Sequence, residues 1–199
     1  MAVDAKAVKA LRDKTGAPML DCREALRETD CDIEKAIVYL REKGIASAGK
    51  KSGRATTEGK VISYIHPGDK LGVLVEIKCE TDFVAKGTDF TEFAKDIAMH
   101  IAAASPRFLS KEDVSEDVLE AERQIYRTQA QNENKPEKII DKIVEGKLGK
   151  FYAEECLLEQ NFVKDDKITI QDYIKSAIAK FGENISIGRF VRFKLGEST

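Results

Sequence analysis

Histidines, cysteines and carboxylates are the side chains of this sequence that could do chemistry, and their spacing limits what that chemistry is. No two of the four cysteines are spaced as Cys-x-x-Cys, and both histidines lie far along the chain from the first two cysteines. A structural zinc site needs four clustered ligands, so we expect no metal site and no cofactor. With two histidines and no nucleophile motif, the sequence also predicts a protein that is not an enzyme. The residues concerned are His66, His100, Cys22, Cys31, Cys79 and Cys156.

The run Glu80-Thr81-Asp82-Phe83 is the unusual segment, because it places a large aromatic residue in a connection between elements. Connections normally use small polar residues, and a phenylalanine there must be buried somewhere. On one interpretation Phe83 folds back onto its own core while Asp82 caps the next turn. On the other, Phe83 is an exposed anchor for a pocket of a partner, with the charge of Asp82 beside it. The pattern alone leaves both interpretations open.

The composition of the 199-residue chain narrows the class of protein. Hydrophobic residues make up 42%, which is enough for a packed core. The 33 basic and 35 acidic side chains leave a formal net charge of −2, which disfavours direct binding to a nucleic acid. No stretch is long and apolar enough to span a membrane, and none resembles a signal peptide. We therefore expect a cytoplasmic protein whose reduced thiols are packed as small apolar groups, with neither membrane nor nucleic acid as a partner.

Residues 1–44 predict a bundle of three short helices. On the second helix Met19, Cys22 and Leu26 lie at i, i+3 and i+7, so we expect them to share one buried face. Gly44 is placed as the residue that ends the third helix. Such a bundle has a small core and is only marginally stable alone.

Residues 45–60 change in composition to alanine, serine, glycine and threonine, and we expect a linker that begins as a frayed helical extension. The segment also holds a cluster of basic side chains. The simpler interpretation of this cluster is a solvated hinge, and the alternative is a contact with an acidic partner. Its members are Lys50, Lys51, Arg54 and Lys60.

Residues 61–199 predict a core domain, which gives the chain an α+β fold with a small antiparallel sheet. Strands over 61–65 and 71–79 form a hairpin, and a final strand over 185–195 joins it. A segment over 151–163 is ambiguous between helix and strand. Helices are expected from 88 to the Ser105-Pro106 pair, over 115–131, from 139 onward with a far end weakened by Gly146 and Gly149, and over 173–181.

Five ordered stretches of the sequence, which together span nearly the whole chain, carry a resemblance to a known family. They are "VKALRDKTGAPMLDCREAL" (8–26), "EIKCETDFVAK" (76–86), "MHIAAASP" (99–106), "KIVEGKLGKFYAEECLLEQNFVKDD" (142–166) and "RFVRFKLG" (189–196). These stretches resemble the bacterial elongation factor Ts family, the guanine-nucleotide exchange factors of elongation factor Tu. The chain is short for this family, and it resembles the members that have one core subdomain.

The resemblance implies that the first 44 residues are a ubiquitin-associated-like module that docks on the G domain of elongation factor Tu. The positions that match its contacts are Arg12, Met19 and Leu20. Because Met19 and Leu20 are adjacent, both cannot face the core of the bundle, so one of them is free for a partner. The simpler interpretation of Arg12 is a solvated charge on a helix.

The resemblance also implies a role for Thr81, Asp82, Phe83 and Val84, which match the Thr-Asp-Phe-Val motif of the family without a departure. In the family this motif is associated with dislodging the magnesium ion from the nucleotide site of elongation factor Tu. The implied function is guanine-nucleotide exchange. The chain would bind elongation factor Tu in its GDP-bound and nucleotide-free states and promote release of GDP in exchange for GTP, with no covalent step.

His100 matches a family histidine near the same interface. Helix periodicity places it away from the stripe that runs from Phe93 to Ile97, which favours a position at the solvent or at an interface. Short members of the family are similar to a homodimer, so His100 could contact the partner in cis or from the second subunit. Whether a cysteine crosslinks such a dimer stays open, although the last strand carries none.

Three other functions compete with nucleotide exchange. A ubiquitin-associated-type adaptor would keep its affinity for a partner in the N-terminal module and would bury Phe83 in a core. An RNA-binding protein would use the basic cluster at 50–60, but the even balance of charge counts against it. A magnesium-dependent phosphohydrolase would use Glu80 and Asp82, but no third ligand or base is nearby in the sequence.

Overall fold

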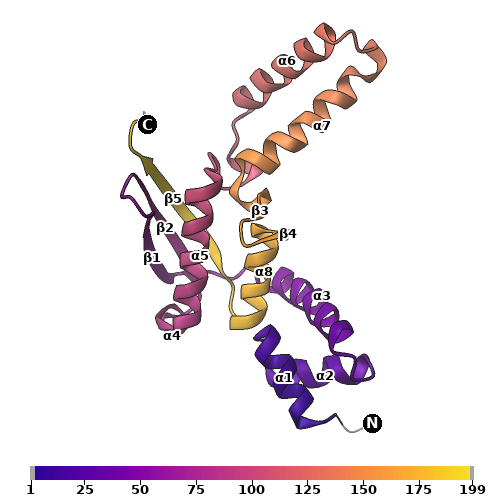
Figure 1. The fold of residues 1–199 in the computed structure, drawn as a ribbon, viewed down its shortest axis with the longest axis vertical. Helices are drawn as coiled ribbons and strands as arrows, with labels where there is room; N and C mark the ends of the chain where they lie inside the picture. Colours follow the sequence, from indigo (N-terminus) through magenta and orange to yellow (C-terminus); the bar gives the residue numbers. More distant parts are fainter. Residues whose placement is uncertain (1–2, 198–199) are drawn as a thin grey trace. The chain divides into compact units, whose positions relative to one another are not determined.

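The computed structural model describes residues 3–197, so the outermost residues of the predicted docking module and core, 1–2 and 198–199, lie outside it. The predicted α+β class is confirmed (Figure 1). In chain order the elements are α1 (Ala5–Thr15), α2 (Met19–Glu28), α3 (Ile33–Lys51), β1 (Glu58–Ile65), β2 (Leu71–Cys79), α4 (Asp82–Lys86), α5 (Thr88–Ala104), η1 (Lys111–Asp113), α6 (Glu116–Asn132), α7 (Glu137–Glu155), η2 (Leu157–Glu159), β3 (Asn161–Phe162), β4 (Asp165–Thr169), α8 (Ile170–Phe181) and β5 (Ser186–Lys194).

Contacts between residues divide the chain into two compact units that are interleaved along the sequence. The first unit contains the residues up to 60 together with 77–93 and 172–188. The second contains 61–76, 94–171 and the residues from 189 onward. The division expected from the sequence, at residues 44 and 60, stays a prediction. No helix within residues 3–197 is long and apolar enough to cross a membrane.

The first three helices enclose a small core of their own. The side chains of Asp4 and Asp32 accept backbone N–H groups at the starts of α1 and α3, and Gly16 ends α1 in the left-handed conformation, with φ of +68°. These local signals place the helix ends where the apolar faces can meet. The buried core consists of Val8, Leu11, Cys22, Ala25, Leu26, Ala36 and Leu40.

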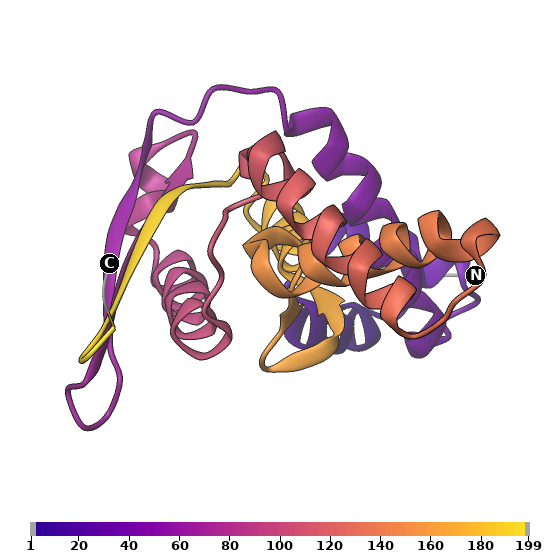
Figure 2. The ribbon, with the colours of Figure 1, turned by 90° about the horizontal axis from the view of Figure 1, so that it is seen from above.

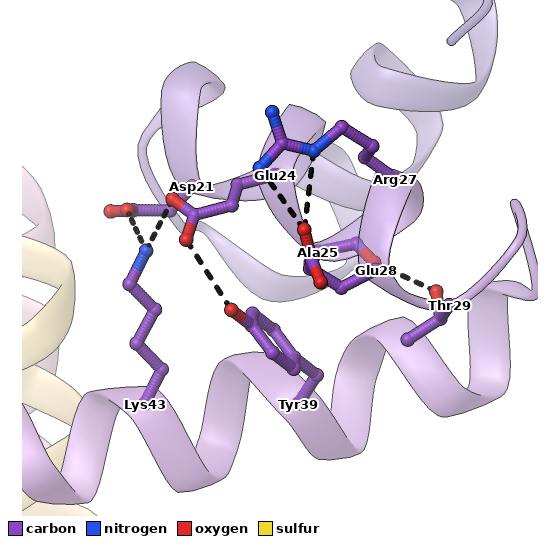
Figure 3. A network of polar contacts seen from close by, with 8 residues as sticks. All are labelled: Asp21, Glu24, Ala25, Arg27, Glu28, Thr29, Tyr39 and Lys43. Carbon is purple, nitrogen blue, oxygen red and sulfur yellow. Dashed lines mark hydrogen bonds and ion pairs between the residues drawn. The ribbon is translucent and has the colours of Figure 1, made fainter. Parts of the chain in front are cut away.

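Polar contacts also fix α2 against α3 (Figure 3). The Lys43 ammonium on α3 donates to carboxylates of Asp21, at 3.0 Å, and Glu24, at 2.7 Å. The hydroxyl of Tyr39 donates to the other carboxylate oxygen of Glu24 at 3.3 Å. The hydrogen bond from Lys43 lowers the pKa of Glu24. Solvent screens such exposed pairs, so they stabilise the bundle only modestly but help to set how α2 lies on α3.

The third helix does not end at Gly44, and that prediction is wrong: α3 continues to Lys51. An ideal Cβ placed on Gly44 would lie 3.0 Å from the Cβ of Ala179 on α8. The glycine therefore permits a close approach of α3 to α8 instead of terminating the helix. The connection between α3 and β1 covers residues 52–57 and is therefore shorter than the linker expected over 45–60.

The predicted hairpin and last strand form a three-stranded antiparallel sheet in the order β1-β2-β5. Alternate side chains of β2 face the core, because Val73, Val75 and Ile77 are all buried. Arg192 on β5 donates to the carbonyl of Ala102 on α5 at 3.4 Å, on the face of the sheet that α5 covers (Figure 2). The six exposed apolar side chains of the sheet are Val61, Ile65, Leu74, Val191, Phe193 and, directly after β5, Leu195.

Helices α6 and α7 pack against each other around a separate core (Figure 1). The start and end of α6 agree with the predicted helix over 115–131. α7 continues past Gly146 and Gly149 to Glu155, and the weakening expected from these glycines stays a prediction. The residues of this core are Val114, Leu119, Ala130, Ile140, Val144, Leu148, Phe151 and Cys156.

Several short elements were not predicted from the sequence. The ambiguous segment over 151–163 contains the end of α7, then η2 and β3, and β3 pairs antiparallel with β4. The connection after β2 contains the one-turn helix α4. Elements of two to five residues are too short to display a periodic pattern of apolar residues, so the spacing of side chains does not reveal them.

Candidate functional site

The segment Thr81–Val84 forms the cap and first residues of α4. Thr81 is the N-cap residue, with extended backbone angles of φ −126° and ψ 153°. Its hydroxyl oxygen accepts the backbone N–H of Val84 at 3.4 Å. Thr81 therefore caps the turn, and the interpretation in which Asp82 does so is wrong.

The aromatic side chain of Phe83 projects into the solvent. It is 84% exposed, which is the highest value among the large apolar side chains that the structure describes. The buried residue of α4 is Ala85, at 4%. The interpretation in which Phe83 folds back onto its own core is therefore wrong, and the exposed position agrees with the interpretation as an anchor for a partner.

Asp82 carries a negative charge beside this aromatic ring. Lys86, one helical turn further on, donates to its carboxylate at 2.6 Å. This hydrogen bond lowers the pKa of Asp82, so the carboxylate is ionised at neutral pH. Both side chains are exposed, and water therefore screens the pair. The carboxylate remains accessible to polar groups of a partner.

The predicted docking residues are all exposed on the first two helices. Arg12 lies in the last turn of α1, and Met19 and Leu20 open α2. Leu20 is 69% exposed and Met19 is 46% exposed. The prediction that Met19 shares a buried face with Cys22 is wrong, because Met19 is the first residue of α2 and lies outside the core of the bundle. Both apolar side chains are thus free to contact a partner.

His100 is buried, and its predicted position at the solvent is wrong: the side chain is 0% exposed on α5. Its Nε2 lies 3.0 Å from Oε1 of Gln160, and its Nδ1 accepts the backbone N–H of Val163 at 3.3 Å. These partners require a neutral ring that carries its proton on Nε2. Burial lowers the pKa of His100, which favours the same neutral form. A direct contact of His100 with a partner stays a prediction, and it would require β3 to move away.

Known proteins resemble this chain over almost its full length. The family described as "Elongation factor TS" matches residues 22–197. Elongation factor Ts of Geobacter sulfurreducens is 56% identical over 197 residues, which cover 99% of this chain and 91% of that protein. Elongation factor Ts of Koribacter versatilis is 57% identical, with 99% and 90% covered. Elongation factor Ts of Desulfosudis oleivorans is 57% identical over 195 residues, or 98% of either chain.

The chain belongs to the elongation factor Ts family. It is therefore a translation elongation factor. The family match, over residues 22–197, includes α4, α5 and the three-stranded sheet. The residues that the resemblance singled out fall into three groups in this family member: Thr81 to Val84 lie together on α4, Arg12, Met19 and Leu20 are exposed on α1 and α2, and His100 is buried on α5.

Sequence reasoning missed two residues that contact the segment at the start of α4. Glu183 and Asn184 follow α8: the carboxylate of Glu183 accepts hydrogen bonds from Glu80 and Thr81, and the backbone N–H of Asn184 donates to Glu80. Thr81 and Glu183 are separated by 102 positions in the sequence. No motif or spacing links residues so far apart, so only the folded chain reveals the contact.

The two carboxylates proposed for a phosphohydrolase are engaged with different partners. Glu80 accepts the backbone N–H of Asn184 and lies 3.6 Å from Arg54, whereas Asp82 pairs with Lys86. Among residues 3–197, no three histidine, cysteine, aspartate or glutamate side chains are arranged to hold a metal ion. The geometry therefore gives the phosphohydrolase hypothesis no support. Of the four free cysteines, Cys22, Cys79 and Cys156 are buried, as expected for packed thiols, whereas Cys31 is exposed, so the expectation is wrong for this residue.

Proposed function

We propose that this elongation factor acts as a guanine-nucleotide exchange factor for elongation factor Tu. It binds the GDP-bound and nucleotide-free forms, displaces the magnesium ion and so promotes the exchange of GDP for GTP. The observation that carries this proposal is the exposed aromatic side chain of Phe83 within an intact Thr-Asp-Phe-Val motif, in a chain of the elongation factor Ts family. The exchange requires no covalent step and no cofactor of the chain's own.

The proposed mechanism is mechanical displacement by Phe83. Bound GDP is held by a magnesium ion that bridges phosphate oxygens and by backbone N–H groups of the phosphate-binding loop. A phenyl ring inserted between helices of the partner shifts the ligands of that ion, because a close-packed interior rearranges instead of absorbing the ring. Asp82, ionised beside the ring, competes for polar groups that orient the magnesium site. By thermodynamic reciprocity, a factor that weakens GDP binding is itself bound best by the nucleotide-free partner.

The proposed docking surface is the exposed end of the first helical bundle. We keep residues 1–44 as the docking module and 61–199 as the core, while the segment 45–60 between them, expected as a linker, contains the end of α3 and the start of β1. Leu20 and Met19 offer apolar area that the bundle itself does not bury, and Arg12 offers a charge near the end of α1. An apolar pair beside an arginine has the composition of an interface hot spot.

We also propose that the chain forms a homodimer through the exposed face of its sheet. The six apolar side chains of this face come from all three strands and the residue after β5. On the same face the guanidinium of Arg189 lies 3.1 Å from the carboxylate of Glu76, so the charges of these two residues compensate each other. An apolar sheet face of this kind is suited to stacking on the same face of a second copy.

Release of a fluorescent GDP from purified elongation factor Tu tests the exchange function. The wild-type chain should accelerate release, and Phe83→Ala should reduce the acceleration by roughly tenfold or more, because truncating a central aromatic anchor typically costs this much or more. The matched control is Ile125→Ala, which removes an exposed apolar side chain, 48% exposed, from α6. Circular dichroism should show all three proteins equally folded.

Two outcomes would count against the proposal. If the wild-type chain leaves GDP release unchanged at micromolar concentration while still binding elongation factor Tu, the adaptor hypothesis replaces exchange. If Phe83→Ala and wild type accelerate release equally, exchange stands and the displacement mechanism through Phe83 is wrong.

A further inference from the structure

We propose that Glu183 is a positioning residue that fixes the direction in which α4 presents Phe83. It acts through a set of crossed hydrogen bonds, which we call the Glu183 clasp and which comprises Glu80, Thr81, Glu183 and Asn184. The inference rests on the proposed exchange function and adds to it a residue outside the Thr-Asp-Phe-Val motif.

The carboxylate of Glu183 binds three donors on two successive residues. One oxygen accepts the backbone N–H groups of Glu80, at 3.2 Å, and Thr81, at 3.0 Å. The other oxygen accepts the hydroxyl of Thr81 at 2.6 Å. Hydrogen bonds to an ionised acceptor are the stronger ones. The start of α4 is therefore attached to one side chain by both its backbone and its capping hydroxyl.

The clasp is reciprocal, because Glu80 in turn binds the chain beside Glu183. Its carboxylate accepts the backbone N–H of Asn184 at 2.6 Å. The amide of Asn184, which is 5% exposed, donates to the carbonyls of Ser52, at 3.2 Å, and Arg54, at 2.8 Å. The two loops at 80–81 and 183–184 are thus bonded in both directions, and Asn184 ties them to the segment that follows α3.

Glu183 also determines how the cap of α4 works. A threonine hydroxyl has one hydrogen to donate and rotates to suit its surroundings. Because this hydrogen points to Glu183, the lone pairs of the oxygen are left to accept the N–H of Val84. Without the carboxylate the hydroxyl hydrogen is free to rotate, so nothing holds the lone pairs of the oxygen toward the N–H of Val84, whose hydrogen bond is already long at 3.4 Å.

The anchoring matters because α4 has little stability of its own. It spans five residues, far fewer than an isolated helix needs in water. The ring of Phe83, at 84% exposure, contributes little packing, so Ala85 is the buried contact of the turn. The exposed pair between Asp82 and Lys86 lies within α4 and cannot tie the turn to the rest of the protein. The clasp does so.

Glu183 is itself held by a well-packed helix. Gly182 ends α8 in the left-handed conformation, with φ of +76°, and donates its N–H to Ile178. The last residue of α8, Phe181, packs edge-on against Phe90 of α5 at 5.9 Å between ring centroids. The carboxylate therefore approaches α4 from a rigid support, as a positioning group requires.

The test compares the dependence of GDP release on concentration for wild type, Glu183→Ala and Glu183→Gln in the full-length chain. In Glu183→Ala, α4 must become ordered when Phe83 inserts into the partner. This ordering should lower the maximal rate of GDP release roughly 5- to 30-fold, which corresponds to the free energy of ordering about one residue. The half-maximal concentration should change little, since the docking surface is untouched. Glu183→Gln keeps one carbonyl oxygen for the two N–H groups and should show an intermediate loss. Glu92→Ala, which removes an exposed glutamate from α5, is the control.

A spectroscopic readout separates the clasp from the exchange function. The chain contains no tryptophan, so Phe83→Trp introduces a single probe at the tip of α4. Combining it with Glu183→Ala should lower the fluorescence anisotropy and increase acrylamide quenching, at temperatures where circular dichroism shows both proteins folded. This measurement needs no elongation factor Tu. If Glu183→Ala does not fold, the same comparison is made with Glu183→Gln.

The outcomes distinguish the two proposals. If wild type does not accelerate GDP release, the exchange function fails, and the anisotropy still decides whether Glu183 orders α4. If wild type accelerates release and Glu183→Ala keeps the full maximal rate, the positioning role is overturned whatever the anisotropy. A fall in maximal rate together with a fall in anisotropy, with Glu92→Ala unchanged, supports it.

Discussion

Phe83 and His100 lie where their polarity would not place them. Leaving a phenylalanine exposed gives up roughly 1.5–3 kcal/mol of burial free energy, whereas a buried imidazole needs a partner for each ring nitrogen. His100 has those partners in Gln160 and Val163. Phe83 instead stands on an anchored turn at 84% exposure. Covering this ring with a partner recovers the burial free energy that folding leaves unused.

The burial of His100 predicts a specific dependence of stability on pH. Since burial lowers the pKa of His100 below its ordinary 6.5, the unfolded chain takes up this proton at a higher pH than the folded chain. The stabilisation is therefore complete above pH 6.5 and is lost as the pH falls from 6.5 through the lowered pKa of the folded state. Urea unfolding between about pH 7.5 and 5.5 measures this slope.

His100→Leu should flatten this slope and lower the free energy of unfolding at neutral pH by roughly 1–3 kcal/mol, because Gln160 and the Val163 N–H lose a partner. The comparison variant is His66→Asn, which removes the other histidine, in the turn between β1 and β2. An unchanged slope in His100→Leu would show that another group controls the acid response.

The sequence could predict part of this arrangement at the residue scale. The adjacency of Met19 and Leu20 showed that one of them must be exposed, and in the structure both are. The predicted position of His100 is wrong because the periodicity of apolar residues describes one helix against one buried face. The residues of β3 and Val163 directly after it cover a second side of α5 at His100, and this strand is too short to predict from the sequence. The choice between the two interpretations of Phe83 depended on Glu183, which no local pattern connects to it.

At the scale of elements, long periodic segments could be predicted from the sequence, whereas the end of α3 predicted from Gly44 is wrong. The helices α6 and α8 agree with their apolar repeats, and the sheet follows from alternation on β2. Gly44 was expected to end α3 because glycine is a frequent C-cap residue. Inside a helix, however, a glycine also serves where another backbone or side chain comes close, and that use depends on the tertiary contact with Ala179. Sequence alone does not separate these two uses.

Two glycines of α3 give a matched test of this explanation. Nothing lies within 4 Å of an added Cβ at Gly49, whereas at Gly44 it meets the Cβ of Ala179 at 3.0 Å. Gly49→Ala should therefore stabilise the protein by up to about 1 kcal/mol through helix propensity. Gly44→Ala gains the same propensity but overpacks the contact with α8, which typically costs about 1–3 kcal/mol, so it should destabilise. Thermal unfolding of both variants measures the difference, and equal stabilisation by both would refute the close-approach explanation.

At the scale of the whole molecule, the exposed sheet face is the feature that folding within one chain does not explain. α5 covers one face of the sheet, and six apolar side chains remain exposed on the opposite face. Contiguous apolar patches on soluble proteins usually mark an interaction surface. The net charge of −2 opposes self-association only weakly. A second copy of the chain offers the same apolar face and is therefore the partner we propose.

Phe193→Glu tests the homodimer. Phe193, 58% exposed, lies on the edge strand β5 of this face. In a twofold dimer each substitution occurs twice, so two unpaired carboxylates would have to be buried, and removal of a partner from a buried charge typically costs about 3–5 kcal/mol. Sedimentation velocity should show a dimer for wild type and a monomer for Phe193→Glu at the same micromolar concentration. The control is Ile125→Glu, which places the same charge on α6 and should remain dimeric.

The alternatives to a second copy give different results in the same experiment. A wild-type monomer at these concentrations would refute the homodimer. If, in addition, Phe193→Glu weakened binding to elongation factor Tu, the sheet face would belong to that partner instead. A Phe193→Glu variant that stays dimeric would place the dimer interface elsewhere, because an isologous interface cannot keep two buried, unpaired carboxylates at little cost.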